Sequence, residues 1–376
     1  MLRILLTGDN HIGLKYAGHP QAAALAQARL SAVKTLVDTA NQEDCALLAV
    51  AGDLFENIYG VLRRDVAAVL DMLSAFRGTV AVLPGNHDYY DKDAKLWQYF
   101  EAELGARDNV LLLSQYRPYC LNIDGQEVVL YPAGCTSLHS APGENNLGWI
   151  KALPALPQGA YHIGIAHGAV EGETIDSEGK YFLMTREELE ALPMDLWLLG
   201  HTHVPFPRGL KKEVFTEAGR IFNAGVHVQK DVACGAEGCC FIIEIDENKK
   251  PRAKKAAPGE LRFYRKELAV SAGELEARLA RELEGMGNGS VVELVLSGAV
   301  TAEEYDRRGE LLDQVLARFL EGSYHDHDLS RLISRELIRA EFPETSFAAG
   351  LLEELLPQPK EAQLAYELLK SLKRGG

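Results

Sequence analysis

Five short stretches of the chain place carboxylate, amide and imidazole side chains directly after runs of Val, Ile and Leu. The residues in these stretches that could bind a metal ion or move a proton are Asp9, His11, Asp53, Asn86, His87, Asp88, His167, His201 and His203. Mixed oxygen and nitrogen donors suit borderline-hard divalent ions such as Mn²⁺, Zn²⁺ or Fe²⁺ better than they suit thiolate metals. The pattern therefore indicates a metal centre with acid–base groups beside it.

The spacing within these stretches supports the same interpretation. Asp9 and His11 are two positions apart, as are His201 and His203. In a locally extended chain, both members of such a pair point to the same side. The stretch at 82–88 is an apolar run broken by Pro-Gly, which leaves its polar residues on the rim of a sheet, where α/β proteins place their ligands.

The elements that must position these residues alternate between strand and helix. Helical spacing of apolar residues is found over 21–39 and 61–76. After the strand that precedes Asp9, the expected strands span residues 45–51, 79–83, 109–113, 118–123, 127–131, 162–166, 196–199, 213–216, 220–223 and 240–245. The three strands at 109–131 resemble antiparallel hairpins, and the three after His203 fit the far side of a two-sheet sandwich. Ligands at successive strand ends predict an α/β fold with helix-covered sheets.

The composition shifts near Ala256-Ala257-Pro258-Gly259, and we expect a domain boundary there. The expected domains are a catalytic domain at 1–258, a small α/β cap at 259–325 and a helical C-terminal segment at 326–376. Capping boxes at 271–274 and 301–304 predict the two helix starts of the cap. Leucines recur in the C-terminal segment and are expected mainly in its core, but the segment is short for a core of its own, so a partner-binding face is the alternative.

Two charged runs are interpreted as solvated polar sequence. The basic run at 249–255 follows three polar residues and is predicted to be a turn, although it could touch a nucleic-acid backbone. The run His325-Asp326-His327-Asp328 resembles a metal motif in composition only and is predicted to be a loop between helices. Neither run is expected to belong to the metal centre.

The composition sets limits on the class of protein. The 376 residues are 47% hydrophobic, enough for a sizeable core, and no apolar run approaches the roughly 18 residues of a membrane helix. Six cysteines, two of them adjacent, favour reduced thiols over a disulfide framework, and we expect a cytoplasmic protein with no membrane contact. A net charge of −15 argues against a protein that grips nucleic acid over its whole surface, but two bound divalent ions would supply local positive charge.

The ordered set D-x-H, G-D, G-N-H-D, a lone His and G-H-x-H resembles the calcineurin-like metallophosphoesterase superfamily over residues 1–225. The resemblance implies a two-sheet α/β/β/α sandwich that binds two divalent ions. The implied ligands are Asp9, His11 and His203 for one ion, Asn86, His167 and His201 for the other, and Asp53 for both. The resemblance also implies that His87 faces the scissile phosphate as a catalytic residue, with Asp88 orienting it.

The blocks at 52–55, 85–88 and 195–203 are similar to those of the SbcD and YhaO-type DNA-repair exonucleases. This resemblance implies a phosphodiesterase, an exonuclease or endonuclease, that acts on DNA in repair or end processing. Manganese is the implied metal, with Fe²⁺, Zn²⁺ or Mg²⁺ as alternatives. The implied partners are DNA, a coiled-coil ATPase of the SbcC type docked on the C-terminal helices, and a second copy of the chain in a homodimer.

One departure and two alternatives belong beside this interpretation. In many relatives a His follows Gly-Asp-Leu-Phe and assists the catalytic His, whereas Glu56 stands at that position here. The first alternative is a phosphoesterase of the same fold that acts on a nucleotide or another small phosphoester, because fold alone does not decide the substrate. The second is a catalytically weak scaffold, and a metal content near zero would support it.

Overall fold

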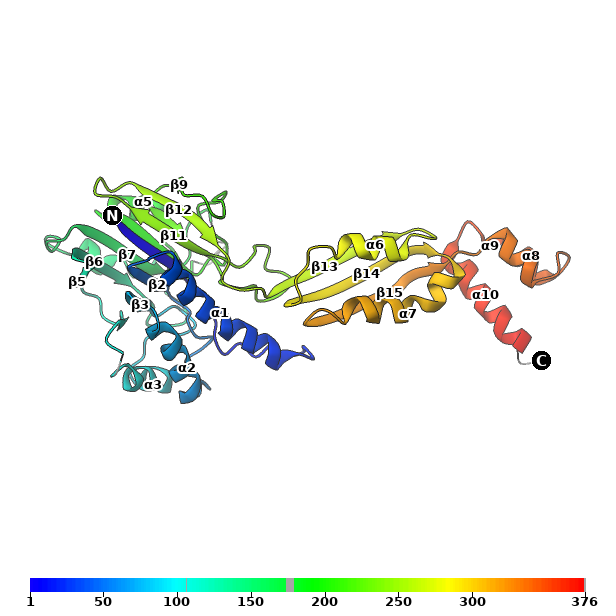
Figure 1. The fold of residues 1–376 in the computed structure, drawn as a ribbon, viewed down its shortest axis with the longest axis horizontal. Helices are drawn as coiled ribbons and strands as arrows, with labels where there is room; N and C mark the ends of the chain where they lie inside the picture. Colours follow the sequence, from blue (N-terminus) through cyan, green and yellow to red (C-terminus); the bar gives the residue numbers. More distant parts are fainter. Residues whose placement is uncertain (106, 174–178, 375–376) are drawn as a thin grey trace. The chain divides into compact units, whose positions relative to one another are not determined.

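The computed structural model describes residues 1–105, 107–173 and 179–374. They form two compact units, Met1–Arg262 and a second unit that begins at Phe263 (Figure 1). The sequence-based boundary after residue 258 lies four residues before this division.

The first unit contains a mixed seven-stranded sheet, with four parallel strands on one side and three antiparallel strands on the other. In spatial order its strands are β4 (Val110–Leu112), β3 (Thr79–Leu83), β2 (Leu47–Ala51), β1 (Leu2–Thr7), β11 (Cys240–Ile245), β12 (Pro251–Ala256) and β9 (Thr216–Glu217). Strands β1 to β4 run parallel, and β11 joins β1 in antiparallel register. The central strands β1, β2 and β3 are mostly apolar and buried, as expected for strands covered on both faces.

A second, five-stranded sheet lies face to face with the first. Its strands, in spatial order, are β10 (Ile221–Asn223), β8 (Leu196–Gly200), β7 (Tyr161–His167), β6 (Gln126–Ala133) and β5 (Tyr119–Ile123). Leu6 and Ala49 of the first sheet belong to the same buried cluster as Ile165 and Leu198 of the second. This cluster is the core between the two sheets.

Helices pack on the outer face of each sheet. Against the first sheet lie α1 (Ala22–Gln42), α2 (Arg63–Ser74) and α3 (Lys95–Leu104), and against the second lie the shorter α4 (Gly148–Lys151) and α5 (Arg186–Ala191). Leu36, Val69 and Trp97 of the first three helices pack in one cluster with β2 and β3, and Leu189 of α5 packs in another with Trp197 of β8. The predicted α/β/β/α sandwich is confirmed.

Three sequence-based assignments in this unit are wrong. The strand expected at 109–113 is β4, which pairs parallel with β3 and is not part of a hairpin. The strands after His203 do not share one sheet, because β9 and β11 complete the first sheet whereas β10 pairs with β8. The basic run at 249–255 is largely strand β12, not a turn. Its residue Ala253 is fully buried opposite Ile243, so pairing with β11 forms the strand despite its charged neighbours.

The second unit contains a three-stranded sheet followed by helices. In chain order its elements are β13 (Arg262–Val270), α6 (Leu275–Glu282), β14 (Ser290–Val300), α7 (Ala302–Leu316), β15 (Glu321–Arg331), α8 (Arg335–Glu341), α9 (Phe347–Leu355) and α10 (Pro359–Arg374). The sheet order is β13-β14-β15, and α6 and α7 pack on one of its faces with Leu279 and Leu312 in the core. The last three helices share a smaller cluster around Ile338, Leu352 and Tyr366.

The loop predicted at 325–328 is wrong, because these residues lie within β15. His325 pairs with Val295 of β14 in a parallel register. The division predicted between 325 and 326 therefore runs through a strand, and residues 326–331 belong to the sheet and not to the helical segment. Strand β15 is polar along most of its length. It therefore forms a strand because it pairs with β14, and its sequence has no apolar pattern that predicts one.

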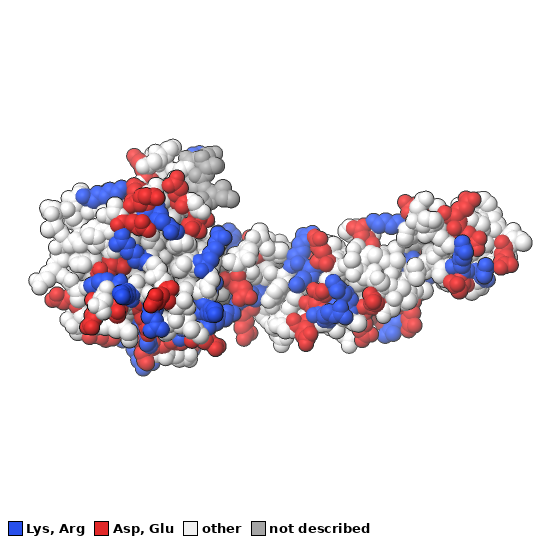
Figure 2. All heavy atoms as spheres, turned by 90° about the horizontal axis from the view of Figure 1, so that it is seen from above, with Lys and Arg blue, Asp and Glu red and all other residues white. Residues whose placement is uncertain are grey.

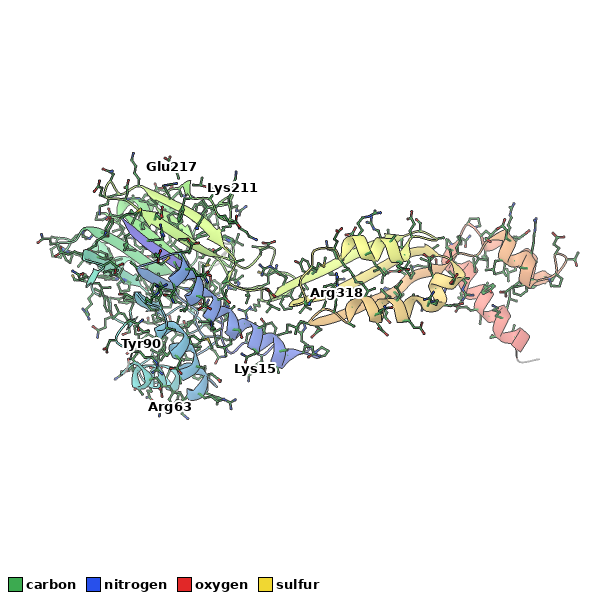
Figure 3. The ribbon with its side chains drawn as sticks, in the orientation of Figure 1. Lys15, Arg63, Tyr90, Lys211, Glu217 and Arg318 are labelled. Atoms are coloured by element: carbon green, nitrogen blue, oxygen red, sulfur yellow. The ribbon has the colours of Figure 1, made fainter. Side chains whose placement is uncertain are left out.

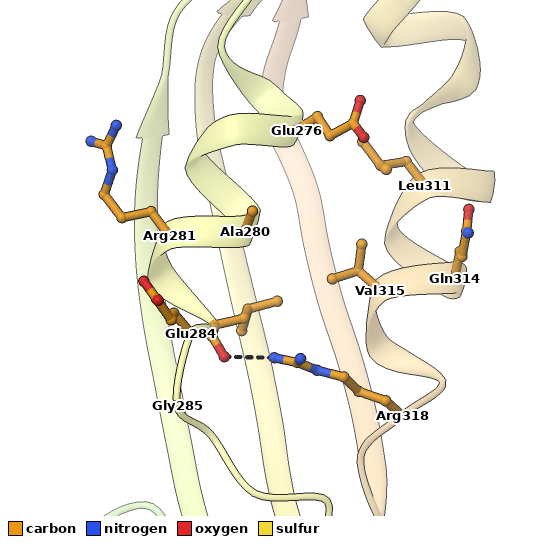
Figure 4. Close-up of a pocket in the computed structure, with 10 residues that line it drawn as sticks. Glu276, Ala280, Arg281, Glu284, Gly285, Leu311, Gln314, Val315 and Arg318 are labelled. Atoms are coloured by element: carbon orange, nitrogen blue, oxygen red, sulfur yellow. Dashed lines mark hydrogen bonds between the residues drawn. The ribbon is translucent and has the colours of Figure 1, made fainter.

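One carboxylate, that of Glu304, caps both α6 and α7. The capping box predicted at Thr301 and Glu304 is confirmed. The box predicted at 271–274 is wrong, because no side chain of that run caps α6; instead the Glu304 carboxylate accepts the amides of Gly273 (2.8 Å) and Leu275 (3.0 Å). Between the two helices lies a groove of about 730 Å³, where Arg318 donates to the carbonyl oxygen of Leu283 at 2.5 Å (Figure 4).

No helix among the described residues combines the length and the apolar character needed to cross a membrane.

Candidate metal centre

The nine residues singled out in the sequence follow directly from strands of the two facing sheets. Asp9 and His11 follow β1, Asp53 follows β2, Asn86 to Asp88 follow β3, His167 ends β7, and His201 and His203 follow β8. The strands involved are neighbours, β1 to β3 in the first sheet and β7 beside β8 in the second. Their ends therefore meet at one edge of the sandwich.

The backbone at this edge is held in an uncommon conformation. Five of the seven expected ligands have positive φ angles: Asp9 (50°), His11 (48°), Asp53 (53°), His201 (101°) and His203 (51°). Residues other than glycine adopt such angles rarely, at a cost of order 1–3 kcal/mol each, and do so mainly at functional sites. Hydrogen bonds between loops enforce the arrangement, for example from the amide of His11 to the carbonyl of Asp53 at 2.9 Å.

Two glycines of the motifs are required by close approach. A Cβ atom on Gly52, whose φ is +92°, would lie 2.1 Å from Nδ1 of His167. A Cβ atom on Gly85 would lie 2.2 Å from Oδ1 of Asp53. Any side chain at either position would displace an expected ligand, which explains why Gly precedes Asp53 and Asn86.

The first expected group of ligands is close in space. His11 Nε2 and His203 Nε2 are 3.1 Å apart, and His203 Nε2 lies 3.7 Å from Oδ1 of Asp9. Asp9 and His11 are fully buried. The Asp9 carboxylate also accepts the amide of His201, at 3.0 and 3.1 Å, which ties the loop after β1 to the loop after β8.

The second group converges on a single oxygen. His167 Nε2 and His201 Nδ1 each lie 3.0 Å from Oδ1 of Asn86. The other ring nitrogen of His167, Nδ1, bonds the carbonyl oxygen of Ala51 at 2.8 Å. This second contact places a proton on Nδ1 and leaves Nε2 with a lone pair for the centre.

Asp53 lies between the two groups, as expected for a shared ligand. Its Oδ2 is 3.4 Å from His167 Nε2 and 3.8 Å from His11 Nε2. Burial alone would raise its pKa, but His167, His11 and His87 together hold the pKa of Asp53 well below its usual range. The carboxylate is thus ionised in a buried place.

Burial and neighbouring charges also shift the pKa values of two histidines of the centre. Burial opposes the charged form of His167, but the Asp53 carboxylate outweighs it and raises the pKa of His167 to about 9. Burial and the neighbouring charge of His167 lower the pKa of His201 to about 4. Without bound ions, His167 therefore also takes up a proton on Nε2, which a bound cation would replace, whereas His201 stays neutral.

These contacts fit a pair of divalent cations. In each group, nitrogen atoms of two buried or half-buried histidine rings lie close to one point. The carboxylates of Asp9 and Asp53 lie beside these points and contact histidine rings and main-chain amides. Neutral imidazole nitrogens and carboxylate oxygens are ligands of Mn²⁺, Zn²⁺ and Fe²⁺. Among the described residues, three groups have donor atoms within 4.8 Å of one another and could hold an ion. These groups are Asp9, His11 and His203; His11, Asp53 and His87; and Asp9, Asp53 and His167.

His87 is half-buried beside the first group. Its amide donates to Oδ1 of Asp53 at 2.8 Å, and its ring meets the ring of His11 edge-on with centroids 4.7 Å apart. Its Nδ1 bonds the main-chain carbonyl of Glu56 at 2.9 Å. Nδ1 therefore carries a proton, and Nε2 is the nitrogen available for chemistry.

The contacts of the Asp88 carboxylate differ from the predicted orienting contact with His87. The Asp88 side chain is fully buried and accepts amides of Gly85 (2.7 Å), Asp53 (3.2 Å) and Phe55 (3.0 Å). It thereby joins the loops after β2 and β3, whereas the carbonyl of Glu56 orients the His87 ring.

Two residues of the site were missed in the sequence. Arg29 of α1 is buried, and its guanidinium donates to carbonyl oxygens of Asn10 (2.7 Å) and Gln229 (2.8 Å), which braces the loop that carries His11. The Glu56 carboxylate, noted in the sequence only as a departure, lies 3.0 Å from Nδ1 of His11. The spacing of residues along the chain carries no signal for either contact.

Comparison with known proteins agrees with this arrangement. The family model described as Calcineurin-like phosphoesterase matches residues 2–205, more than half of the chain. The chain belongs to the calcineurin-like phosphoesterase family. Among its described residues it carries groups of side chains that could hold a metal ion, as expected for this family.

Individual relatives are more distant. The Bacillus subtilis (strain 168) protein named "Uncharacterized metallophosphoesterase YhaO" is 26% identical over 200 residues, which are 51% of this chain and 45% of that protein. The crystal structure of TT1561 of Thermus thermophilus covers 68% of this chain and 99% of its own, at 14% identity and a TM-score of 0.41. A dimetal phosphatase from Danio rerio, LOC 393393, covers 69% and 98%, at 12% identity and a TM-score of 0.36.

Proposed function

We propose that the chain is a two-metal phosphodiesterase that cleaves DNA in repair or end processing. The observation that carries the hydrolytic part is the convergence of seven ligand-type side chains, from five strand ends, around the shared carboxylate of Asp53. Manganese is the proposed metal and the cytoplasm the proposed compartment. DNA as the substrate rests on the motif resemblance and on the second unit, which follows the catalytic fold.

Different residues of the chain have different roles in the proposed hydrolysis. Asp9, His11 and His203 would hold one ion and Asn86, His167 and His201 the other, with Asp53 between them. Bound divalent ions supply Lewis acidity toward phosphate oxygens and lower the pKa of bound water. The strained backbone of the loops and the hydrogen bonds between the loops hold these ligand side chains in place before the substrate arrives.

His87 is the proposed catalytic residue outside the ligand set. Its Nδ1–H is donated to the Glu56 carbonyl, so its Nε2 can face the scissile phosphate and donate or accept a proton there. Its amide is fixed to Asp53 at the same time. Proton transfer by such a group contributes about 10²–10⁴-fold to a rate.

The C-terminal helices are the proposed docking site for a coiled-coil ATPase of the SbcC type. On α10, Leu364, Leu368 and Leu372 are 61%, 57% and 74% exposed, at the i, i+4 and i+8 spacing of one helix face. Phe347 on α9 is 81% exposed. An apolar stripe of this kind suits an apolar partner surface, such as another helix. A homodimer is a second proposed assembly.

The surface charge of the chain makes such a partner useful for DNA binding. The net charge is −15, and Figure 2 shows acidic and basic side chains interspersed on the face drawn there. DNA binding depends on clustered Lys and Arg, since these neutralise phosphates and release counterions. In the proposed complex, the metal ions would bind the scissile phosphate and the ATPase would help to hold the duplex.

Cleavage assays with the full chain test this proposal. Labelled single- and double-stranded DNA, bis-p-nitrophenyl phosphate and p-nitrophenyl phosphate are incubated with Mn²⁺ and, as a control, with EDTA. We expect DNA and diester cleavage that EDTA abolishes. Ester cleavage without DNA cleavage, with or without the ATPase, would instead identify an enzyme of nucleotides or other small phosphoesters. No cleavage and no metal would identify a scaffold.

A further inference from the structure

Glu56 makes two contacts that connect an expected metal ligand with the proposed catalytic residue. Its carboxylate Oε2 lies 3.0 Å from Nδ1 of His11, in the geometry of an ion pair more than of a straight hydrogen bond. Its main-chain carbonyl oxygen accepts from Nδ1 of His87 at 2.9 Å. The side chain is only 21% exposed, and the His11 ring is fully buried. The pair is therefore largely removed from competing water.

The backbone leaves Glu56 little freedom to move away from His11. The amide of Glu56 donates to the carbonyl of Ile12 at 3.0 Å, and the amide of Ile12 donates to the carbonyl of Leu54 at 2.9 Å. The loop after β1 and the loop after β2 thus run side by side as paired backbone. This pairing places residue 56 directly beside His11, although the two are far apart in the sequence.

We infer that Glu56 is a positioning residue: its carboxylate keeps the proton of His11 on Nδ1 and turns Nε2 toward the metal centre, which raises the affinity of that site for a divalent cation. This inference rests on the proposed two-metal centre. A metal-binding His usually donates its other ring N–H to a carboxylate or carbonyl, which fixes the tautomer and makes the ligand more basic. Loss of such a partner typically lowers metal affinity about 10–100-fold.

Direct metal binding by Glu56 is a less suitable role. Among the described residues, none of the three donor groups that could hold an ion includes Glu56. Its Oε2 points at Nδ1 of His11, the nitrogen that faces away from His203, whereas Nε2 lies 3.1 Å from His203 Nε2. The carboxylate is therefore behind the ligand ring and supports it.

The two contacts of Glu56 can be separated by mutation. Substituting the side chain removes the carboxylate from His11 but leaves the main-chain carbonyl that holds His87. The defect of a side-chain variant should therefore appear in metal binding, and added Mn²⁺ should restore the turnover. A general disturbance of the loop would lower turnover at every Mn²⁺ concentration.

The test uses the full chain and three variants: Glu56→Ala, Glu56→Gln, which keeps an oxygen acceptor, and the control Glu217→Ala. Glu217 is an exposed residue of β9, at the edge of the first sheet, and its loss changes the net charge equally (Figure 3). Calorimetric titration of metal-free protein measures Mn²⁺ affinity. Imidazole ¹⁵N NMR of the metal-free protein reports the tautomer of His11, assigned with His11→Asn. Urea unfolding verifies that each variant is folded.

We expect Glu56→Ala to lower the affinity for one Mn²⁺ about 10–100-fold, Glu56→Gln to lower it less, and Glu217→Ala to leave it unchanged. The ¹⁵N signals of His11 should show a protonated Nδ1 in the wild type and a shift toward a tautomer mixture in Glu56→Ala. Unchanged affinity and tautomer in Glu56→Ala, or equal losses in all three variants, would overturn the inference. If the wild type binds no Mn²⁺, the proposed metal centre itself is refuted.

Discussion

The fully buried carboxylate of Asp88 offers the sharpest test of how the site is built. Its Oδ1 accepts the amides of Gly85 and Asp53, and its Oδ2 accepts the amide of Phe55. Burial and the neighbouring charge of Asp53 raise the pKa of Asp88 to about 7, against the pull of these amides. If Asp88 serves mainly as this acceptor, its replacement should reduce stability, whereas a residue that only orients His87 should affect turnover alone.

The contacts give the size of the expected effect. A buried donor left without an acceptor costs about 1–3 kcal/mol. Asp88→Asn can keep Oδ1 for two amides but turns an NH₂ group toward the amide of Phe55, so we expect a loss of about 1–3 kcal/mol in the free energy of unfolding. Asp88→Ala leaves three amides without an acceptor, and the loss should be about 3 kcal/mol or more.

Urea unfolding of the full chain, followed by circular dichroism, measures these losses. Asp108→Asn is the matched control, because Asp108 is exposed on the same unit and should change the stability by less than about 0.5 kcal/mol. A thermal scan should show Asp88→Asn unfolding at a lower temperature than the control. If Asp88→Asn is as stable as the control and loses only turnover, the role assigned to Asp88 here is incorrect.

Three other predictions concern chemistry, metal and pH. His87→Ala should keep both Mn²⁺ ions in a calorimetric titration but lower diester turnover about 10²–10⁴-fold. Asp53→Ala should lose Mn²⁺ binding in the same titration, because it removes the carboxylate shared by both groups. Burial, together with the charge of Arg29, lowers the pKa of buried His227 well below its usual value. Below about pH 6.5 the unfolded chain therefore binds a proton at this residue that the folded chain does not. The free energy of unfolding measured in urea should decrease as the pH is lowered through this range, and it should decrease less steeply in His227→Gln.

Each of these predictions has a clear contrary result. Normal cleavage by His87→Ala would remove that residue from the chemical step, and full Mn²⁺ binding by Asp53→Ala would show that the carboxylate is not shared. For His227, equal slopes of stability against pH in the variant and the wild type would show that its protonation is not linked to unfolding.

The sequence was sufficient to predict the elements with strong periodicity and the ligands at their ends. Apolar runs such as 47–51 are strands because they are buried on both faces, and this leaves a clear pattern. The motif residues after them had to lie at one edge once the strands were parallel neighbours. The approach of Asp53 to His11 was thus predictable from order and spacing, whereas that of His167, which ends a strand of the other sheet, was implied by the family resemblance.

Polar strands and contacts between loops could not be predicted in this way. Strands β12 and β15 carry charged or polar residues at most positions and exist because β11 and β14 pair with them. The Glu304 carboxylate caps α6 from another helix, so the local run at 271–274 gave the wrong cap. The contact of Glu56 with His11 depends on two loops meeting in space, which no local pattern records.

The most direct test of the account is the number of Mn²⁺ ions that the metal-free chain binds in a calorimetric titration. We expect two ions per chain in the wild type. We expect one ion in His203→Ala and one in Asn86→Ala, because these residues belong to different groups of ligands. A wild-type chain that binds one ion or none, or two variants that both keep two ions, would contradict the central claim that two cations share Asp53.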